Sequence, residues 1–430
     1  MRNILILGAG KSSIALIDYL AEHAVNQNWQ ITVGDITAAQ ALQKTKGRPR
    51  TKAIGFDFSK VEKRKALVAK ADIVISMLPA AMHLALAEDC LQAKKNLVTP
   101  SYISEAMKGL HTKVAKAGLI FMNEIGLDPG IDHMSAMQML DRLKAEGKVI
   151  KGFKSHCGGL VAPESDDNLW HYKFTWNPRN VILAGQGEGG IHYLSKGKKV
   201  DLKYEQLFAG VEELKVKGFG KFESYPNRDS LKYIAEYGLE GVKTMYRGTL
   251  RRPPYCKAWN ALIQLGFTNP NYIDTADFKA TVKKLLANKK TIKDKQVKTL
   301  IDDTGVVELL NKQSDKKIIP ALLLQHKLEG QWIMHPHDKD MVVMIHQVEY
   351  TNANDRGKKT MEASLVCLGK DMEHTAMAET VGLPVAMVTK MILNGDIKRR
   401  GVLMPKYPEI YNPILAELET YGIRFKEKIS

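Results

Sequence analysis

A short apolar run followed at once by a glycine turn constrains the fold of this chain more than any other feature. Residues 4–7 are apolar, a turn with two glycines follows, and apolar residues then recur at helical spacing from Ile14. Gly8 permits a tight turn and Gly10 lets the backbone approach a pyrophosphate, while Ser13 replaces the third glycine of the fingerprint. The segment therefore predicts dinucleotide binding at a helix N-terminus. The expected cofactor contacts are Gly8, Gly10, Lys11, Ser12 and Ser13.

Further short apolar segments alternate with helical segments through the first 125 residues. Strands are expected at residues 29–33, 53–56, 73–76, 96–99 and 119–122. This alternation predicts a doubly wound parallel sheet of the α/β class. Ligands of such sheets bind beyond the carboxyl ends of the strands, so the residues that directly follow them should face one crevice. These residues include Asp57, Leu78, Ser101 and Tyr102.

The residue after the second strand bears on the choice of cofactor. Asp35 stands 25 positions after Gly10, where the fingerprint expects an acid for the ribose hydroxyls. An acid there repels a 2′-phosphate, so NAD is expected in preference to NADP. Arg48 and Arg50 lie too far along the chain for the usual phosphate position. A solvated turn residue is the alternative role of Asp35.

Residues 126–133 combine turn formers, two carboxylates and an imidazole. Asp128, Pro129 and Gly130 must end the preceding strand, and Asp132 falls in the first turn of the helix that follows. Taken alone, the segment predicts a strand-to-helix turn. His133 is expected to be structural. His83 and His111 are expected on helices, in packing or solvent-facing roles, since no carboxylate or serine near them in the sequence forms a recognisable pair.

The second half of the chain reads as a mixed domain with a helical insert. Strands are expected at residues 149–157, 181–184, 341–348 and 361–368, the last two as an antiparallel pair around the turn-rich residues 352–357. Residues 226–325 are lysine-rich and read as helical. Helices are also expected at 375–393, interrupted at 382–384, and at 413–421, in a tail that packs back on the first domain.

Bulk properties exclude several classes of protein. A chain of 430 residues, 44% of them hydrophobic, suits two or three domains. It has no run of eighteen apolar residues, so a soluble, cytoplasmic protein without membrane contact is expected. Four cysteines without CxxC spacing argue against zinc and disulfides, and no metal is expected. The net charge of +16 comes from dispersed lysines, which favours attraction of small anions over nucleic-acid binding.

Arginines on turns of the second domain are candidate anion ligands. Arg179 follows Asn177 and Pro178, and a planar guanidinium there could hold a carboxylate by two hydrogen bonds. A surface charge is the alternative, and Arg228 and Arg247 are open to the same two interpretations.

Several local motifs together resemble saccharopine dehydrogenase of the glutamate-forming type. They are Gly126 to His133, Cys157 to Glu164, Tyr172 to Arg179, Tyr225 to Ser230 and Ala376 to Pro384, in the family's order. The resemblance implies a doubly wound Rossmann domain (1–125 with about 390–430), a mixed α/β substrate and dimerisation domain (126–225 with about 326–389) and a helical insert (about 226–325). It also implies a homodimer.

The resemblance further implies a reaction and a set of substrate contacts. Saccharopine, NAD(P)+ and water would give 2-aminoadipate 6-semialdehyde, L-glutamate and NAD(P)H, in lysine metabolism. Ser101, Tyr102, Asp128, Cys157 and Arg179 are placed around the substrate. Asp128 is expected to transfer a proton or hold the amine's charge, Tyr102 to be a second acid–base group or an anchor, Cys157 a neutral neighbour, and Arg179 a carboxylate ligand. A water relay could replace the proton-transfer groups.

Two other functions remain open at this point. One is a related imine-reducing dehydrogenase of polyamine metabolism, of the carboxynorspermidine or homospermidine type. Its diamine substrate would favour acidic pocket residues, so the positive net charge and Arg179 count against it. The other is a non-catalytic NAD-binding regulatory protein, against which only the presence of Tyr102, Asp128 and Arg179 speaks.

Overall fold

The chain forms two compact units in the computed structural model, which describes residues 1–187, 189–288, 292–352 and 357–430. Unit 1 consists of Met1–Arg142 and Gly369–Arg424, and unit 2 of Leu143–Leu368 and Phe425–Ser430. The domain limits expected from the sequence differ, since they divide the chain at residue 125 and put 369–389 with the substrate domain. In the structure the helix that follows residue 130 and the helix that begins at residue 376 both contribute to unit 1.

Unit 1 is built on a parallel sheet whose order, over the described residues, is β17-β6-β5-β4-β1-β2-β3. The chain starts in the middle at β1, proceeds outward to β3, and returns to extend the sheet from β4 on the other side. This order is the doubly wound arrangement predicted from the sequence, with β17 added by the C-terminal segment. The strands are β1 (Arg2–Leu7), β2 (Trp29–Asp35), β3 (Thr51–Gly55), β4 (Ile73–Ser76), β5 (Asn96–Val98), β6 (Ile120–Met122) and β17 (Gly401–Leu403).

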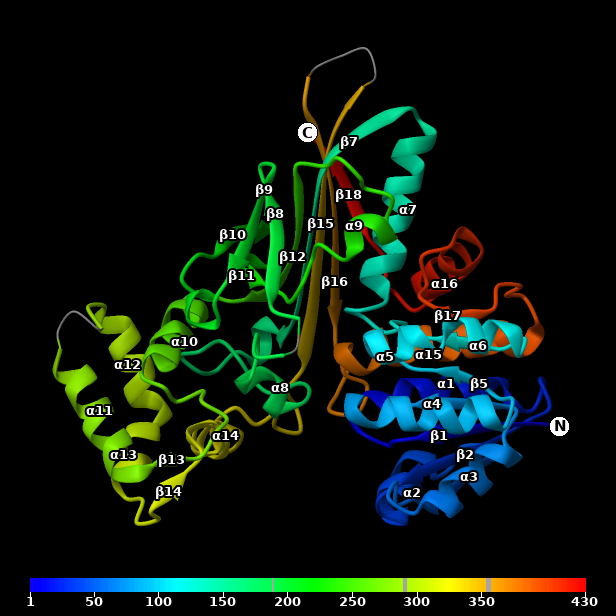
Figure 1. Ribbon diagram of the computed structural model, residues 1–430, viewed down its shortest axis with the longest axis horizontal. Coiled ribbons are helices and arrows are strands. Elements are labelled where there is room, and N and C mark those ends of the chain that lie inside the picture. The colour runs from blue at the N-terminus through cyan, green and yellow to red at the C-terminus, as the bar shows by residue number, and fades with distance from the viewer. Residues whose placement is uncertain (188, 289–291, 353–356) are drawn as a thin grey trace. The chain divides into compact units, whose positions relative to one another are not determined.

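Helices bury both faces of this sheet (Figure 1). Leu5 and Leu7 of β1 pack in one hydrophobic cluster with residues of α3 to α6, and Ile4 and Ile6, on the opposite face, are also buried. A strand that is covered on both faces reads as a continuous apolar run, as residues 4–7 do. The helices are α1 (Ile14–Ala24), α2 (Ala38–Thr45), α3 (Val61–Lys70), α4 (His83–Gln92), α5 (Glu105–Gly109), α6 (His111–Lys116), α7 (Ile131–Ala145), α15 (Ala376–Asn394) and α16 (Pro408–Thr420).

Helix α15 is continuous, so the interruption expected at residues 382–384 is wrong. The Thr375 side chain caps its start by accepting from the amide of Ala378, and Gly395 ends it with a φ of 77°. A Cβ at Gly382 would lie 2.8 Å from the Leu16 nitrogen, so this glycine lets α15 approach α1 closely instead of breaking the helix. By length and composition α15 could cross a membrane, but 78% of that stretch is buried inside the protein.

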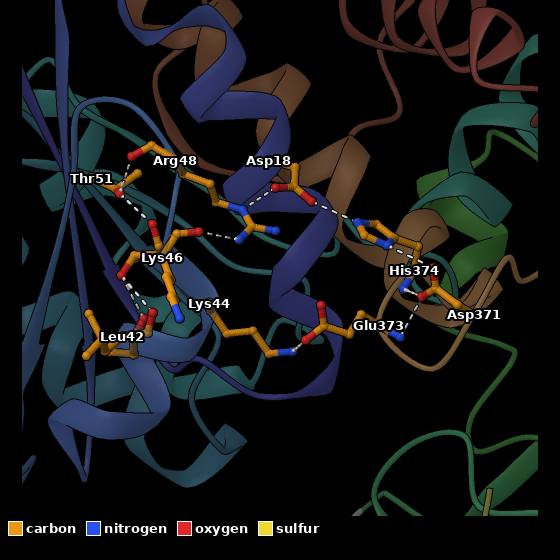
Figure 2. A network of polar contacts seen from close by, with 11 residues as sticks. Asp18, Leu42, Lys44, Lys46, Arg48, Thr51, Asp371, Glu373 and His374 are labelled. Carbon is orange, nitrogen blue, oxygen red and sulfur yellow. Dashed lines mark hydrogen bonds and ion pairs between the residues drawn. The ribbon is translucent and has the colours of Figure 1, made fainter. Parts of the chain in front are cut away.

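Ion pairs join the segment before α15 to the first two helices of the unit (Figure 2). Asp18 on α1 accepts from Arg48 and lies 2.9 Å from His374 Nε2, while Lys44 pairs with Glu373 at 3.1 Å. Burial works against the charge of His374, but its bonds to Asp18 and Asp371 outweigh that effect and raise its pKa. Burial likewise opposes the charge of Asp18, and the bonds from Arg48 and His374 lower its pKa overall.

Unit 2 is built on a mixed sheet whose described strands follow the order β10-β11-β12-β7-β15-β16-β18, with β8 paired to β12 and to β9. The antiparallel pairing of β15 and β16 confirms the predicted pair, although residues 353–356 of its turn lie outside the described residues. The strands are β7 (Lys148–Val161), β8 (Ile191–Ser195), β9 (Lys198–Leu202), β10 (Glu212–Val216), β11 (Gly220–Pro226), β12 (Thr244–Arg251), β15 (Asp340–Asn352), β16 (Lys359–Leu368) and β18 (Lys426–Ile429). The short strands β13 (Ile273–Asp274) and β14 (Lys317–Ile318) form a separate pair.

Two sequence predictions for unit 2 are wrong. Residues 181–184 do not start a strand, because Pro178 at the first position and the Asn177 side chain, which accepts from the amide of Arg179, begin helix α8 (Pro178–Ile182). Residues 226–325 are not all helical, because β12 lies between β11 and β7 in the sheet. Its apolar pattern is interrupted by Arg247 and Arg251, yet both side chains are 2% exposed.

The helical part of unit 2 begins after β12 and has its own core. Buried aromatic residues, among them Trp170, Trp259 and Trp332, belong to one cluster with side chains of α10 to α14. The helices of the unit are α8, α9 (Tyr233–Glu236), α10 (Tyr255–Gln264), α11 (Thr275–Ala287), α12 (Lys295–Thr304), α13 (Val306–Asn311) and α14 (Pro320–Gln331).

Replacing His374 should destabilise the protein in a pH-dependent way. The raised pKa of His374 means that its stabilisation is present below the unfolded-state pKa and is lost as the pH rises through the folded-state pKa. His374→Gln should therefore lower the free energy of unfolding by up to about 1 kcal/mol near pH 5.5, the scale of a partly exposed ion pair, and by less at pH 9. Urea denaturation at both pH values measures this difference, and an equal loss at both would contradict the role of charge. His111→Gln is the control, because the partner of the His111 ring is a neutral group, the carbonyl oxygen of Val402, and not a carboxylate.

Candidate functional site

The glycine turn after β1 has the geometry that a dinucleotide needs. Gly8 has a φ of +102°, and a Cβ there would lie 2.7 Å from the carbonyl oxygen of Met77, so the position requires glycine. A Cβ at Gly10 would meet nothing within 4 Å, which leaves open space beside the turn for a pyrophosphate. Ser13 Oγ donates to the carbonyl oxygen of Gly10 at 2.8 Å, so this hydroxyl closes the turn instead of reaching a phosphate.

Asp35 is bound to backbone amides around the same turn. Its Oδ2 accepts from the amide of Ala9 at 2.6 Å, and its Oδ1 accepts from the amide of Ile36 at 2.7 Å. The carboxylate thus helps to hold the glycine turn against the end of β2. The sequence argument assigned this carboxylate to the ribose hydroxyls. Part of its hydrogen-bonding capacity is instead used by these two backbone amides.

A buried histidine at the carboxyl end of β4 holds one of the predicted substrate residues. His83, the first residue of α4, has Nε2 2.6 Å from Ser101 Oγ and Nδ1 2.9 Å from Ser76 Oγ. Burial lowers the pKa of His83 to about 4, so the ring is neutral at pH 7. The prediction that no serine pairs with His83 is wrong: the partners are 7 and 18 positions away and meet because β4 and β5 are neighbours.

The corner at residues 126–133 is a tightly closed turn. Gly130 has a φ of +148°, and a Cβ there would overlap the carbonyl oxygen of Gly126. The amide of Gly126 donates to the carbonyl oxygen of Pro129 at 2.8 Å, and that of Gly130 donates to Asp132 Oδ1 at 2.6 Å. Asp132 therefore serves the start of α7, as the sequence indicated.

His133 and Glu124 brace the corner from inside the protein. His133 Nε2 lies 2.8 Å from Glu124 Oε2, and Glu124 Oε1 accepts from the amide of Ile103 at 2.9 Å. Both side chains are buried. This pair ties the corner to the loop that carries Ser101 and Tyr102, and Glu124 was not singled out from the sequence because no motif marks it.

Tyr102 and Asp128, both predicted to lie around the substrate, are hydrogen-bonded to each other. The Tyr102 hydroxyl donates to Asp128 Oδ1 at 2.8 Å, and both side chains are half-buried. Tyr102 follows β5 and Asp128 follows β6, two neighbouring parallel strands, so the carboxyl edge of the sheet brings them together. The pair can move a proton between a carboxylate and a phenol and hold a positive charge next to both.

The remaining predicted contacts are divided between the units. Asp57 and Leu78 follow β3 and β4 in unit 1, whereas Cys157 on β7 and Arg179 on α8 belong to unit 2. Cys157 is buried. Arg179 Nη1 is buried and has no hydrogen-bond partner among the described residues, which is unusual for a guanidinium and leaves it available for a carboxylate. These roles stay predictions.

Family models match almost the whole chain. Residues 4–122 match the model described as "Saccharopine dehydrogenase NADP binding domain", and residues 126–423 match "Saccharopine dehydrogenase C-terminal domain". Saccharopine dehydrogenase [NADP(+), L-glutamate-forming] of Saccharomyces cerevisiae is 36% identical over 99% of both chains. The mitochondrial alpha-aminoadipic semialdehyde synthase of Mus musculus is 34% identical over 99% of this chain, which spans 47% of that larger protein.

Solved structures agree with these matches. The apo saccharopine dehydrogenase (L-Glu forming) of Saccharomyces cerevisiae superposes over 100% of both chains with a TM-score of 0.84 and 34% identity. The homospermidine synthase of Legionella pneumophila, with 12% identity, covers 100% of this chain and 91% of its own with a TM-score of 0.57, and shares the fold alone.

The expectation of NAD as the main cofactor is wrong. The matched dinucleotide-binding model is that of an NADP binding domain, and the relatives from Saccharomyces cerevisiae and Pyricularia oryzae are named as NADP(+) enzymes. The argument from Asp35 did not take into account that both of its oxygens already accept backbone amide protons.

The closed corner predicts a large difference between two glycine-to-alanine substitutions. Gly130→Ala should lower the free energy of unfolding by more than about 3 kcal/mol, because it adds both overlap with the backbone of Gly126 and an unfavourable φ. Gly118→Ala is the matched control: its φ of +73° is also unfavourable, but a Cβ there meets nothing within 4 Å, so about 1 kcal/mol is expected. Denaturant unfolding compares the two, and equal losses would contradict the role of the contact.

Proposed function

Because the chain belongs to the saccharopine dehydrogenase family, we propose that it oxidises saccharopine with NADP+ and water to 2-aminoadipate 6-semialdehyde, L-glutamate and NADPH. The contact that carries the proposal is the hydrogen bond between Tyr102 and Asp128 at the carboxyl edge of β5 and β6. It puts an acid–base pair on the side of the sheet where a doubly wound fold binds its ligands.

The reaction begins with removal of a proton. The secondary amine of saccharopine is protonated at neutral pH, and the nitrogen lone pair must be free before the adjacent carbon can lose hydride. Asp128 takes this proton, or it stabilises the positive charge of the ammonium group until the proton leaves. NADP+, held by Gly10, Lys11 and Ser12, would supply the acceptor for the hydride of the lysine-derived ε-carbon, and the substrate would then be an imine.

Hydrolysis of the imine needs the same acid–base groups, which now also return a proton to the nitrogen. Water adds to the imine carbon, and the carbinolamine that results breaks its C–N bond when the nitrogen is protonated and the hydroxyl loses its proton. Tyr102 passes protons between water and the carboxylate, and its hydrogen bond to Asp128 supports this role. The products are the aldehyde and the free amino group of glutamate, so atoms and charge balance with one proton released.

The substrate carries three carboxylates and therefore needs cations and hydrogen-bond donors. The resemblance assigns one carboxylate to Arg179, whose Nη1 has no partner among the described residues. Ser101 supplies a hydroxyl whose orientation the neutral His83 ring fixes at 2.6 Å. Cys157 is a neutral neighbour, since the reaction needs no covalent intermediate. Gly10, Lys11 and Ser12 would hold the cofactor's pyrophosphate, because the Gly10 side of the turn is open.

We also propose that the protein is a homodimer located in the cytoplasm that binds neither nucleic acid nor membrane. The dimer is proposed from the resemblance to the family. The lack of nucleic-acid binding is proposed because the lysines are dispersed along the chain. Light scattering coupled to size-exclusion chromatography should give twice the chain mass of 48.1 kDa, and a single-chain mass would contradict the dimer.

Substrate choice separates this function from that of polyamine dehydrogenases. Purified protein should reduce NADP+ with saccharopine and not oxidise carboxynorspermidine, because the proposed ligands favour carboxylates over a diamine. Absorbance at the wavelength of the reduced nicotinamide measures both rates. Activity with carboxynorspermidine alone would contradict the proposal, and activity with neither, despite NADPH binding, would favour a regulatory protein.

Replacing Asp128 should affect turnover and leave cofactor binding unchanged. Asp128→Asn should lower kcat by about 100-fold or more, the usual contribution of a positioned acid–base group, with an unchanged Kd for NADPH. Asp141→Asn is the matched control. Asp141 also accepts from a tyrosine hydroxyl, that of Tyr411 at 2.7 Å, but it lies near the C-terminal end of α7 and not in the corner before it. Its kcat should stay within about twofold of the wild type. Steady-state rates and fluorescence titration test both, and an active Asp128→Asn variant would remove the proposed role.

A further inference from the structure

A hollow beside the carboxyl ends of β2 and β3 has no role in the site described so far. It has a volume of about 450 Å³, and Ile36 after β2, Asp57 after β3 and the start of α3 line it. The adenosine half of a dinucleotide lies beyond the carboxyl end of the second strand in a doubly wound fold. The hollow is therefore next to the place where the adenosine 2′-phosphate of NADP must be bound.

The lining of the hollow suits a phosphate group. Lys60, Lys63 and Lys70 contribute three cations, and Asp57 is the one carboxylate among the lining residues, all of which the structure describes. Asp57 Oδ1 already accepts from the amide and the hydroxyl of Ser59, at 2.9 and 2.7 Å. The lysines outnumber the single carboxylate, so the hollow carries a net positive charge that attracts a phosphate.

Two other cations that follow β2 are already paired. Arg48 binds Asp18 and Lys44 binds Glu373, as Figure 2 shows. By contrast, neither Lys60 nor Lys63 forms an ion pair anywhere in the described part of the chain. Lys60 is the residue that precedes α3 and Lys63 lies in its first turn, so both are at the end of the helix that adjoins Asp57. Lys70, at the opposite end of α3, lies further from the strand ends.

Asp35, which the sequence argument set against a 2′-phosphate, does not line the hollow. Its two oxygens accept amide protons from Ala9 and Ile36, which partly offset its charge. Ile36, the next residue, is 66% exposed and contributes an apolar side chain to the hollow. With Phe56 and Leu67 it provides the apolar surface on which a nucleotide base can pack.

We propose that Lys60 and Lys63 recognise the 2′-phosphate of NADP(H), in place of a basic residue directly after β2. This inference rests on the proposed use of NADP. It explains how a chain with an acid at position 35 binds NADP. The cations that select the phosphate lie at the start of α3, which follows β3, and not directly after β2.

The experiment is fluorescence titration of the full-length protein with NADPH and with NADH, without saccharopine. Lys60→Gln and Lys63→Gln should each weaken NADPH binding by about fivefold, and the double variant by about twentyfold, while NADH binding stays within about twofold. The salt dependence of NADPH binding should be shallower in the double variant than in the wild type. Lys65→Gln is the matched control, since Lys65 is exposed on α3 but does not line the hollow.

Three outcomes would overturn the inference. One is an equal loss of NADPH and NADH affinity in the lysine variants. Another is a wild type that binds both cofactors equally. The third is an unchanged preference in these variants together with its loss in Lys11→Gln, which would assign the phosphate to the glycine turn. Because the titration omits saccharopine, a protein that fails to oxidise saccharopine can still show this selectivity, so the two proposals fail separately.

Discussion

The close contact between Gly130 and Gly126 is the constraint on which the site depends. It exists only because Gly130 carries no Cβ, and it turns the chain sharply from the end of β6 into α7. Asp128 lies at the tip of this turn, where its carboxylate meets the Tyr102 hydroxyl. A wider turn would move Asp128 away from Tyr102, so the packing of two glycines sets the position of the proposed proton-transfer group.

Buried polar pairs then fix the groups around this turn. His83 holds Ser101, and the pair of His133 and Glu124 joins the corner to the loop after β5. His83 is kept neutral by burial, so its ring adds no positive charge beside Ser101. In the proposed reaction, such a site would bind a protonated amine without a competing cation from His83, and the buried pairs would hold the acid–base groups in place.

Much of unit 1 could be predicted from the sequence because its signals are local. The apolar run at residues 4–7 and the glycines after it specify β1 and its turn directly, and the strands that follow are short and covered on both faces. Where the sequence failed, contacts from distant segments decided the outcome. Gly382 and Pro384 looked like a helix break, but packing against α1 keeps α15 continuous. β12 was missed because its arginines are buried. The roles of His83 and Glu124 could not be predicted, since their partners come from other loops. The cofactor prediction from Asp35 was wrong, and the hydrogen bonds of this residue to backbone amides cannot be seen in the sequence.

The products of the reaction test the account most directly. Saccharopine has two C–N bonds that an oxidoreductase could break, and the proposed chemistry oxidises the carbon on the lysine side. Mass spectrometry of a reaction with saccharopine and NADP+ should therefore find glutamate and 2-aminoadipate 6-semialdehyde in amounts equal to the NADPH formed. Lysine and 2-oxoglutarate in their place would show that the other bond breaks, and would contradict the assignment of the substrate's orientation over Asp128 and Tyr102.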